Sequence, residues 1–307
     1  NLNADRNPGQ AKMSIFVKIL WMIFNYINNN IPPKYFSNKR NIYDLSVKQF
    51  SKQICKTDWE YISPVSTPSR MFCDLFWKNI KWDDVKDEIG DINIFDTGCG
   101  DGNYSLKINN FAGGINSYVG VDSVVYKSWH NLQSANEFVR VSKLLSTNIL
   151  PEIPRSTNFI ITQSAIEHFD YDLDYFRQIK RYIEKSGKNI IQVHLFPTPP
   201  SLWLYLHHGV RQYNMRSIYK IIDIFNSIRS YSVIYPLGGR HSFNFHMKNV
   251  TIPDYFLKRI PTYRELNVDK YFSGAKISIE KDIRSISWKF ASFSAIVIHS
   301  NYDNIIF

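Results

Sequence analysis

The stretch Asp96-Thr97-Gly98-Cys99-Gly100-Asp101-Gly102 follows directly on the short run Ile92–Phe95 and places glycine at three alternate positions. A short, mostly apolar run predicts a buried strand, and glycine lets the backbone that follows turn tightly and approach a ligand closely. The helix expected after Gly102 would direct its first N–H groups at a bound anion. Strand, glycine loop and helix in this order predict a cofactor site.

Strands and helices alternate along the chain from this loop onward. The clearest helix is 172–185, which Asp172 is expected to cap and Gly187 to end. This alternation predicts an α/β fold with a mostly parallel sheet and helices on both faces. The expected strands are seven: 92–95, 117–121, 140–144, 158–162, 189–196, 231–235 and 293–299.

Three classes of cofactor could use such a loop. No Gly-Lys-Ser/Thr follows it, which excludes a Walker phosphate loop. The Gly-x-Gly-x-Gly spacing disfavours a dinucleotide, because Asp101 would bring a carboxylate close to a pyrophosphate. S-adenosylmethionine has a sulfonium cation, an amino group and only one carboxylate, so it tolerates both Asp96 and Asp101. The loop therefore favours S-adenosylmethionine.

Asp122 closes the second expected strand, 26 positions after Asp96. A carboxylate in this place can accept two hydrogen bonds from a ribose diol. Aspartate before serine is also common in turns, so a purely structural role stays open. Together with the glycine loop, Asp122 supports binding of an adenosine.

These segments resemble the class I S-adenosylmethionine-dependent methyltransferases. Asp96–Gly102 resembles the family's acidic residue followed by Gly-x-Gly-x-Gly, and Gly120-Val121-Asp122 resembles its second, acidic motif. Gln163–Phe169 looks like the segment ending in Glu-His after the fourth strand, and Lys185–Lys188 looks like the turn before the fifth. The resemblance covers residues 91–196 and the last two strands, and it implies the Rossmann-like fold of that family.

The resemblance also implies which residues contact the cofactor. Thr97 replaces the usual aliphatic residue, and Asn148 stands where many members have an aspartate near the adenine amine, a contact that an asparagine carbonyl can still make. The expected cofactor contacts are Asp96, Gly98, Cys99, Gly100, Gly102, Asp122, Ser123, Asn148, Ile149, Gln163 and Ser164.

The expected methyltransferase domain, 43–307, follows an N-terminal extension and contains one long insertion. Residues 1–42 form an N-terminal extension and linker, of which 1–12 lack an initiator Met and could be an expression remnant. Residues 15–27 are too few to span a bilayer, so the helix expected there packs on the domain or lies at a membrane surface. Helices are also expected at 43–56 and 70–82. Residues 237–288 are a long insertion between the last two strands, expected to cover the substrate.

The formal charge is +10, and residues 205–289 hold 14 Lys/Arg against six Asp/Glu. This excess is either an ordinary solvated surface or a site for a partner that carries phosphate. The three cysteines, Cys55, Cys73 and Cys99, show no metal-site spacing, and no other grouping predicts a metal ion. These features predict a cytoplasmic protein, with the inner face of the membrane as the alternative location.

Histidine is the usual general base near neutral pH. His194 is expected near the carboxyl end of its strand, where open α/β sheets bind ligands, and His241 follows the sixth strand. His168 is expected at the rim, where it would help to order the cofactor. His207 and His208 belong to an aromatic segment. Arg211 and Arg240 could hold an acidic acceptor as bidentate donors. For each residue an ordinary packed or surface role is the alternative.

The leading hypothesis is O-methylation of a sugar, or of another small or lipid-linked glycan precursor. Aromatic residues suit sugar rings, and a basic surface suits a diphosphate. One alternative is an RNA methyltransferase, although no nucleic-acid-binding module and no Asn-Pro-Pro-Tyr or Pro-Cys signature is present. The other is a non-catalytic protein of the same fold. The sequence does not predict an oligomeric state.

Overall fold

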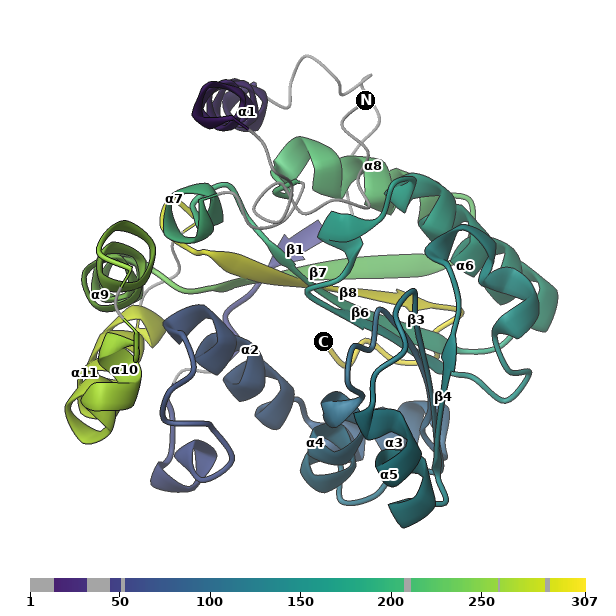
Figure 1. Cartoon of the computed structure of the whole chain (residues 1–307). Coiled ribbons are helices and arrows are strands. Elements are labelled where there is room, and N and C mark those ends of the chain that lie inside the picture. The colour runs from purple at the N-terminus through teal and green to yellow at the C-terminus, as the bar shows by residue number, and fades with distance from the viewer. Residues whose placement is uncertain (1–13, 32–44, 51–52, 207–210, 259, 285–287) are drawn as a thin grey trace.

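The computed structural model describes residues 14–31, 45–50, 53–206, 211–258, 260–284 and 288–307. Eight strands form one sheet in the order β1-β7-β8-β6-β5-β2-β3-β4 (Figure 1). All neighbouring strands are parallel except β8, which runs antiparallel to both β6 and β7. The strands are β1 Leu45–Val47, β2 Asn93–Thr97, β3 Ser117–Asp122, β4 Val139–Lys143, β5 Phe159–Gln163, β6 Ile190–Pro197, β7 Ser230–Leu237 and β8 Phe293–Ser300.

The chain reverses its direction across the sheet between β2 and β5. From β2 it passes to β3 and β4 on one side, and β5 and β6 then continue on the other side of β2. Open parallel sheets bind their ligands in the crevice beyond the carboxyl ends of the strands at such a reversal. The loop after β2 lies at this point, so the sheet order places the glycine loop where a ligand is expected.

Helices cover both faces of the sheet and form one apolar core with each face (Figure 1). The first core contains residues from α2 Pro68–Lys78, α3 Trp82–Ile89, α4 Asn103–Phe111 and α5 Ser128–Ala135. The second contains residues from α6 Asp172–Ser186 and α8 Met215–Phe225. Strands β2, β5, β6 and β8 are buried along their whole length, as expected for strands covered on both faces. The α/β sandwich predicted from the sequence is confirmed.

The described part of the chain differs from the predicted elements in three places. The helix expected over 43–56 is wrong, because Leu45–Val47 pairs with β7 as an eighth, edge strand. The helix expected over 70–82 belongs to two helices, because α2 ends at Lys78 and α3 begins at Trp82. Asp172 lies in the first turn of α6 and accepts from the N–H of Leu173, so Tyr171 and not Asp172 occupies the cap position. Gly187 ends α6 with φ 62°, as expected.

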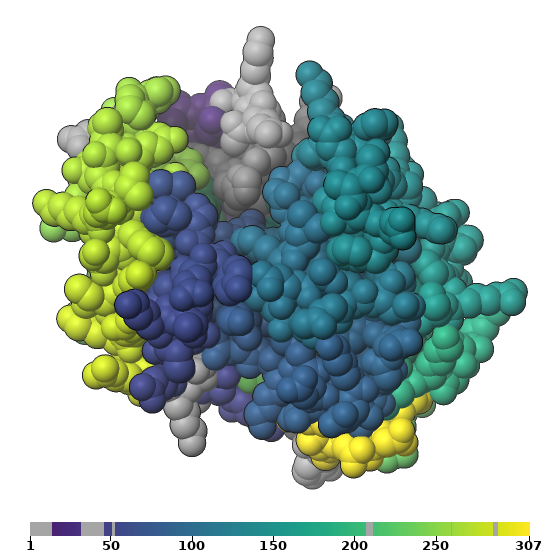
Figure 2. Space-filling view, turned by 90° about the horizontal axis from the view of Figure 1, so that it is seen from below, coloured from purple at the N-terminus to yellow at the C-terminus, as the bar shows by residue number. Residues whose placement is uncertain are grey.

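The insertion between β7 and β8 is helical. It contains α9 Arg240–His246, the π-helical segment η6 Met247–Phe256, α10 Tyr263–Leu266 and α11 Val268–Ile283. The buried carboxylate of Asp282 joins α11 to α9 by accepting from the backbone N–H groups of His241 and Ser242 at 3.0 and 2.7 Å. Arg264 and Tyr271 donate to the carbonyls of Val65 and Ser66, so the insertion lies beside the segment that precedes α2 (Figure 2).

The N-terminal helix α1, Ile15–Asn30, lies outside the sandwich, on the side of α8 and the short helix α7, Ser201–Tyr205 (Figure 1). Trp21 is its buried residue, and Asn29 donates to Gln212 at 2.9 Å. Elsewhere on α1, Ile15, Phe16 and Phe24 are at least 65% exposed. Across the described residues, every helix is too short or too polar to cross a membrane.

Candidate functional site

The glycine loop needs its glycines for two different reasons. Gly98, Gly100 and Gly102 all have positive φ, at 79°, 58° and 82°, a conformation that other residues rarely adopt. A Cβ on Gly98 would lie 2.4 Å from the Cβ of Ala165, and one on Gly102 would lie 2.4 Å from a methyl group of Leu132. A Cβ on Gly100 would meet nothing within 4 Å. The two ends of the loop are therefore packed, while its middle faces open space.

Asp122, at the end of β3, holds the middle of the loop. One carboxylate oxygen accepts from the backbone N–H of Gly100 at 2.9 Å, and the other accepts from the N–H of Val124 at 3.0 Å. The side chain is only partly buried. Each carboxylate oxygen has a second lone pair, so Asp122 can accept from a ligand as well as from the loop.

Asp96 lies below the loop and is almost completely buried. The hydroxyl of Tyr118 donates to Oδ2 at 2.5 Å, whereas Oδ1 is buried and has no hydrogen-bond partner among the described residues. Burial raises the pKa of this carboxyl to about 7, and the Tyr118 hydrogen bond opposes that rise. A buried acceptor of this kind suits a cationic or hydrogen-bond-donating group of a ligand.

Ser164 and Glu167 follow β5, the neighbour of β2. Ser164 has φ 56°, a strained conformation for a residue with a side chain and one that is common at functional sites. Its hydroxyl donates to Oε1 of Glu167 at 2.6 Å. Glu167 is 2% exposed, so this hydrogen bond fixes an almost buried carboxylate at the carboxyl end of the sheet.

A cavity of about 390 Å³ opens beside Glu167, between α2, the ends of β5 and β6, and the insertion. Its charged and polar side chains include Arg70, Glu167, Tyr205 and Arg264. Phe293, at the start of β8, adds an aromatic surface. The cavity therefore combines one carboxylate, two guanidinium groups and two aromatic rings.

Arg70 connects this cavity to the glycine loop. Its guanidinium donates to the hydroxyl of Tyr104 at 3.1 Å, and Tyr104 lies in the first turn of α4, directly after the loop. The same hydroxyl donates to Asp74 at 2.7 Å, and Lys107 forms a 2.8 Å salt bridge with Asp74. This network keeps one cationic group between the loop and the cavity.

The three candidate histidines lie in different environments. His194 is completely buried against the α6 face of β6, with its Nδ1 3.0 Å from the hydroxyl of Thr162, and burial lowers its pKa to about 3. His241 is exposed on the first turn of α9. His168 lies beside Glu167, with 4.0 Å between Nε2 and Oε1, and burial lowers its pKa. None of the three lines the cavity beside Glu167; His207 and His208 lie outside the described residues.

The two candidate substrate arginines do not line this cavity either. Arg211 forms a 2.6 Å salt bridge with Asp172, which ties it to the first turn of α6. Arg240 is exposed at the start of α9. Arg70 and Arg264 line the cavity instead, although they are 194 positions apart in the sequence. No sequence pattern joins them, because their meeting depends on how the insertion packs on the segment before α2.

The remaining predicted cofactor residues lie at the carboxyl ends of β2 to β5 or in the segments just after them. Cys99 is buried beneath the loop, and Gln163 accepts from the indole N–H of Trp77 at 2.7 Å. Ser123 and Asn148 are exposed, whereas Ile149 is completely buried and its N–H donates to Gln178. The sequence alone could have indicated Glu167 as a site residue, because it stands directly before His168 in the segment that resembles the family.

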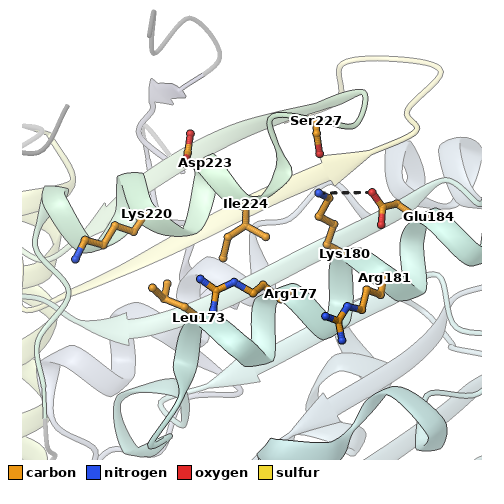
Figure 3. Close-up of a pocket in the computed structure, with 9 residues that line it drawn as sticks. All are labelled: Leu173, Arg177, Lys180, Arg181, Glu184, Lys220, Asp223, Ile224 and Ser227. Carbon is orange, nitrogen blue, oxygen red and sulfur yellow. Dashed lines mark ion pairs between the residues drawn. The ribbon is translucent and has the colours of Figure 1, made fainter. Parts of the chain in front are cut away.

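A second hollow lies on the outer surface, between α6 and α8 (Figure 3). Four basic side chains, Arg177, Lys180, Arg181 and Lys220, line it together with Glu184 and Asp223. Lys180 forms a 3.5 Å salt bridge with Glu184. Because the groove lies on the outside of two helices and not at the strand ends, it is a surface feature rather than part of the crevice.

The strand order decides the fold class. Without the edge strand β1, the order is β4-β3-β2-β5-β6-β8-β7. The last strand in the chain, β8, is antiparallel and is inserted between β6 and β7. The chain has the fold of the class I methyltransferases. The doubly wound dinucleotide-binding order has no such inserted strand.

No protein-family model matches the chain, and no curated protein sequence is significantly similar to it. Among solved structures, the plantazolicin methyltransferase BamL, in complex with a triazolic desmethylPZN analog and S-adenosylhomocysteine, is similar at a TM-score of 0.48 and 10% identity, over 80% of this chain and 88% of that one. An S-adenosylmethionine-dependent methyltransferase from Mesorhizobium loti reaches 0.42 and 11%, over 69% and 92%. The [4+2]-cyclase SpnF reaches 0.42 and 14%, over 71% and 79%. The fold assignment therefore rests on the strand order and not on these structural similarities.

The burial of Asp96 predicts a dependence of stability on pH. The carboxyl ionises near its ordinary pKa of 3.8 in the unfolded chain and near 7 in the folded protein. Between these values the folded state keeps a proton that the unfolded state has lost, so its contribution falls as the pH rises, by up to about 4 kcal/mol. Asp96→Asn should remove this loss, so that the variant gains stability relative to the wild type between pH 5 and pH 8 in urea unfolding.

Asp101→Asn, in the same loop but exposed, is the control. Its free energy of unfolding should change with pH as that of the wild type does. If Asp96→Asn and the wild type differ by the same free energy at both pH values, burial does not control the ionisation of Asp96.

Proposed function

We propose that this chain is an S-adenosylmethionine-dependent methyltransferase. The observation that carries the proposal is the convergence of three features at the reversal between β2 and β5. These are a glycine loop with an open middle, the partly exposed carboxylate of Asp122 beside it, and the orphaned carboxylate oxygen of Asp96 below it. The cavity next to Glu167 then provides room for a methyl acceptor.

Each polar group of the cofactor has a matching residue at this site. Asp122 would accept from the ribose hydroxyls, and Asp96 from the cationic amino group. Arg70 would bind the carboxylate of the methionine part, because a guanidinium matches a carboxylate in charge and shape. When bound, S-adenosylmethionine supplies a methyl group activated by its attachment to a positively charged sulfur. Orienting the acceptor toward that group is the main task left to the protein.

Glu167 is the residue that we propose as general base. A hydroxyl that attacks the methyl carbon forms a new C–O bond while the C–S bond breaks and its electron pair stays on sulfur. The proton of the hydroxyl must then leave, and the Glu167 carboxylate at the cavity wall can accept it. His194 is too deeply buried for this role, and Ser164 holds Glu167 in place.

A sugar hydroxyl is the acceptor that we propose. Tyr205 and Phe293 offer aromatic surfaces against which a sugar ring can pack, and Thr67 and Ser201 offer hydroxyl groups for hydrogen bonds. Arg264, which also forms a 3.2 Å salt bridge with Asp254, lies on the insertion side of the same cavity. A guanidinium has five N–H donors, so Arg264 can also donate to an acidic substituent or a phosphate of a glycan precursor.

The roles of Asp122 and Arg70 are separable by titration calorimetry with two ligands. S-adenosylhomocysteine carries the amino acid part, and 5′-methylthioadenosine lacks it. Asp122→Ala should weaken both ligands at least tenfold, because both have the ribose. Arg70→Gln should weaken S-adenosylhomocysteine about tenfold, the loss of one charge-assisted interaction, and leave methylthioadenosine within twofold.

Arg264→Gln is the matched control, since it removes a guanidinium from the other side of the cavity and should leave both affinities unchanged. A wild-type chain that is folded and binds neither ligand contradicts the proposed function and favours a non-catalytic protein of this fold. Equal weakening of both ligands by Arg70→Gln contradicts only the assignment of Arg70.

Glu167→Gln keeps the shape of the side chain and removes its ability to accept a proton. We expect it to slow methyl transfer 10²–10⁴-fold, a typical contribution of a general base, with little change in the affinity for S-adenosylhomocysteine. The measurement is transfer of a tritiated methyl group to polyprenyl-diphosphate-linked glycans, with Glu280→Gln, on an exposed residue of α11, as control. A methyl ether survives alkali, so counts released as methanol by alkali would instead indicate methylation of a carboxylate.

Contact with a membrane through residues 15–27 is part of the same proposal. The outer face of α1 presents Phe16 and Phe24 to solvent, and the basic groove between α6 and α8 lies on the same side of the sheet (Figures 1 and 3). An apolar helix beside basic residues suits an anionic lipid surface.

The double variant Phe16→Glu with Phe24→Glu should therefore release the chain from phosphatidylglycerol vesicles in co-sedimentation. The exposed Ile277 of α11 offers the control, Ile277→Glu, which should sediment as the wild type does. A wild-type chain that stays in the supernatant with these vesicles would show that α1 is not a membrane contact.

A further inference from the structure

A second cavity, of about 640 Å³, lies at the carboxyl edge of the sheet beyond β6. Its walls come from the end of α1, the turn after β6, α7, the first turn of α8, α9 and the segment before β8. Six aromatic side chains line it: Tyr26, Trp203, Tyr213, Phe243, Trp288 and Phe290. Neither the glycine loop nor Glu167 belongs to this cavity, so the proposed methyl transfer does not account for it.

Helix α7 separates this cavity from the one beside Glu167. Ser201 and Tyr205, four residues apart on one side of α7, line the cavity beside Glu167, whereas Leu202 and Trp203 line the aromatic cavity. The end of β6 also lies between the two cavities. Its last residue, Pro197, lines the cavity beside Glu167, and the next residue, Thr198, lines the aromatic cavity. Helix α7 therefore lies between the two cavities, and a ligand that fills both must pass around it.

The lining selects a ligand with an apolar chain and an anionic group. Aromatic rings, prolines, Leu202 and Met215 supply most of the wall, and Arg216 and Lys289 supply two basic groups. The guanidinium of Arg216 donates to the carbonyl of Asn28, so this arginine also ties the end of α1 to the cavity. Apolar walls with two cations suit a chain that ends in a phosphate, and no carboxylate lines this cavity among the described residues.

We propose that the aromatic cavity binds the isoprenoid chain and first phosphate of a lipid-linked methyl acceptor, whose sugar reaches past α7 to Glu167. The proposal rests on the proposed function and names its substrate class. Tyr26 of α1 packs edge-on against Trp203, with 5.9 Å between the ring centroids, so the cavity wall continues directly into the helix whose outer face is apolar. A lipid chain can thus enter from a membrane surface that contacts α1.

Farnesyl phosphate is a soluble probe for this site. Titration calorimetry with the full chain should show micromolar binding of farnesyl phosphate and none of inorganic phosphate. Lys289→Gln should weaken farnesyl phosphate at least fivefold and leave farnesol unchanged, because only the phosphate meets the cation. Met215→Trp should fill the cavity and weaken both farnesyl compounds at least tenfold. Lys248→Gln, on an exposed lysine of η6, is the matched control and should bind as the wild type does.

S-adenosylhomocysteine affinity, measured for each variant, separates the two proposals. Unchanged affinity shows that the variant is folded and that the cofactor site is intact. No binding of farnesyl phosphate by a chain that binds S-adenosylhomocysteine overturns the lipid assignment and leaves the methyltransferase proposal standing. Farnesyl phosphate binding that neither Lys289→Gln nor Met215→Trp changes also overturns it, because the ligand then binds elsewhere.

Discussion

The hydrogen bond from the Gly100 N–H to the Asp122 carboxylate is the contact on which the rest of the site depends. It joins the loop after β2 to the end of β3, and it holds the middle of the loop where a side chain would have open space around it. The close approaches of Gly98 to Ala165 and of Gly102 to Leu132 fix the two ends. A loop held at three points is already shaped for a ligand, so little conformational entropy is lost on binding.

Two buried carboxylates near this loop, Asp96 and Asp74, differ in how the protein compensates them. Asp96 is kept in the core with one oxygen unpaired, an arrangement that costs stability unless a ligand compensates it. Asp74, also buried, is compensated within the protein by Tyr104 and Lys107. The unpaired oxygen of Asp96 fits the proposed binding of a ligand, whereas the Asp74 network positions Arg70 through Tyr104.

The sheet could be predicted from the sequence because its central strands are buried on both faces and read as continuous apolar runs. The edge strand β1 could not, since three residues give too little pattern to separate a strand from a helix. The complete burial of β6 also explains why the sequence made His194 a candidate general base. Every residue of β6 is buried, so the sequence contains no alternation to show that His194 faces α6.

The glycine loop is local in sequence and was predicted residue by residue, whereas the cavity proposed for the acceptor is assembled from distant segments. Arg70 precedes the sheet, Glu167 follows β5 and Arg264 belongs to the insertion, and only the packing of α9 to α11 beside α2 brings them together. The aromatic cavity is equally non-local, because it needs α1, α7 and the segment before β8 at the same edge.

A crystal structure of the chain with S-adenosylhomocysteine tests the central claim most directly. We expect the ribose hydroxyls within hydrogen-bond distance of Asp122, the amino group at the free oxygen of Asp96, and the sulfur facing the cavity that contains Glu167. A ligand bound elsewhere, or a glycine loop whose open middle is closed by protein side chains in the crystal, would contradict it.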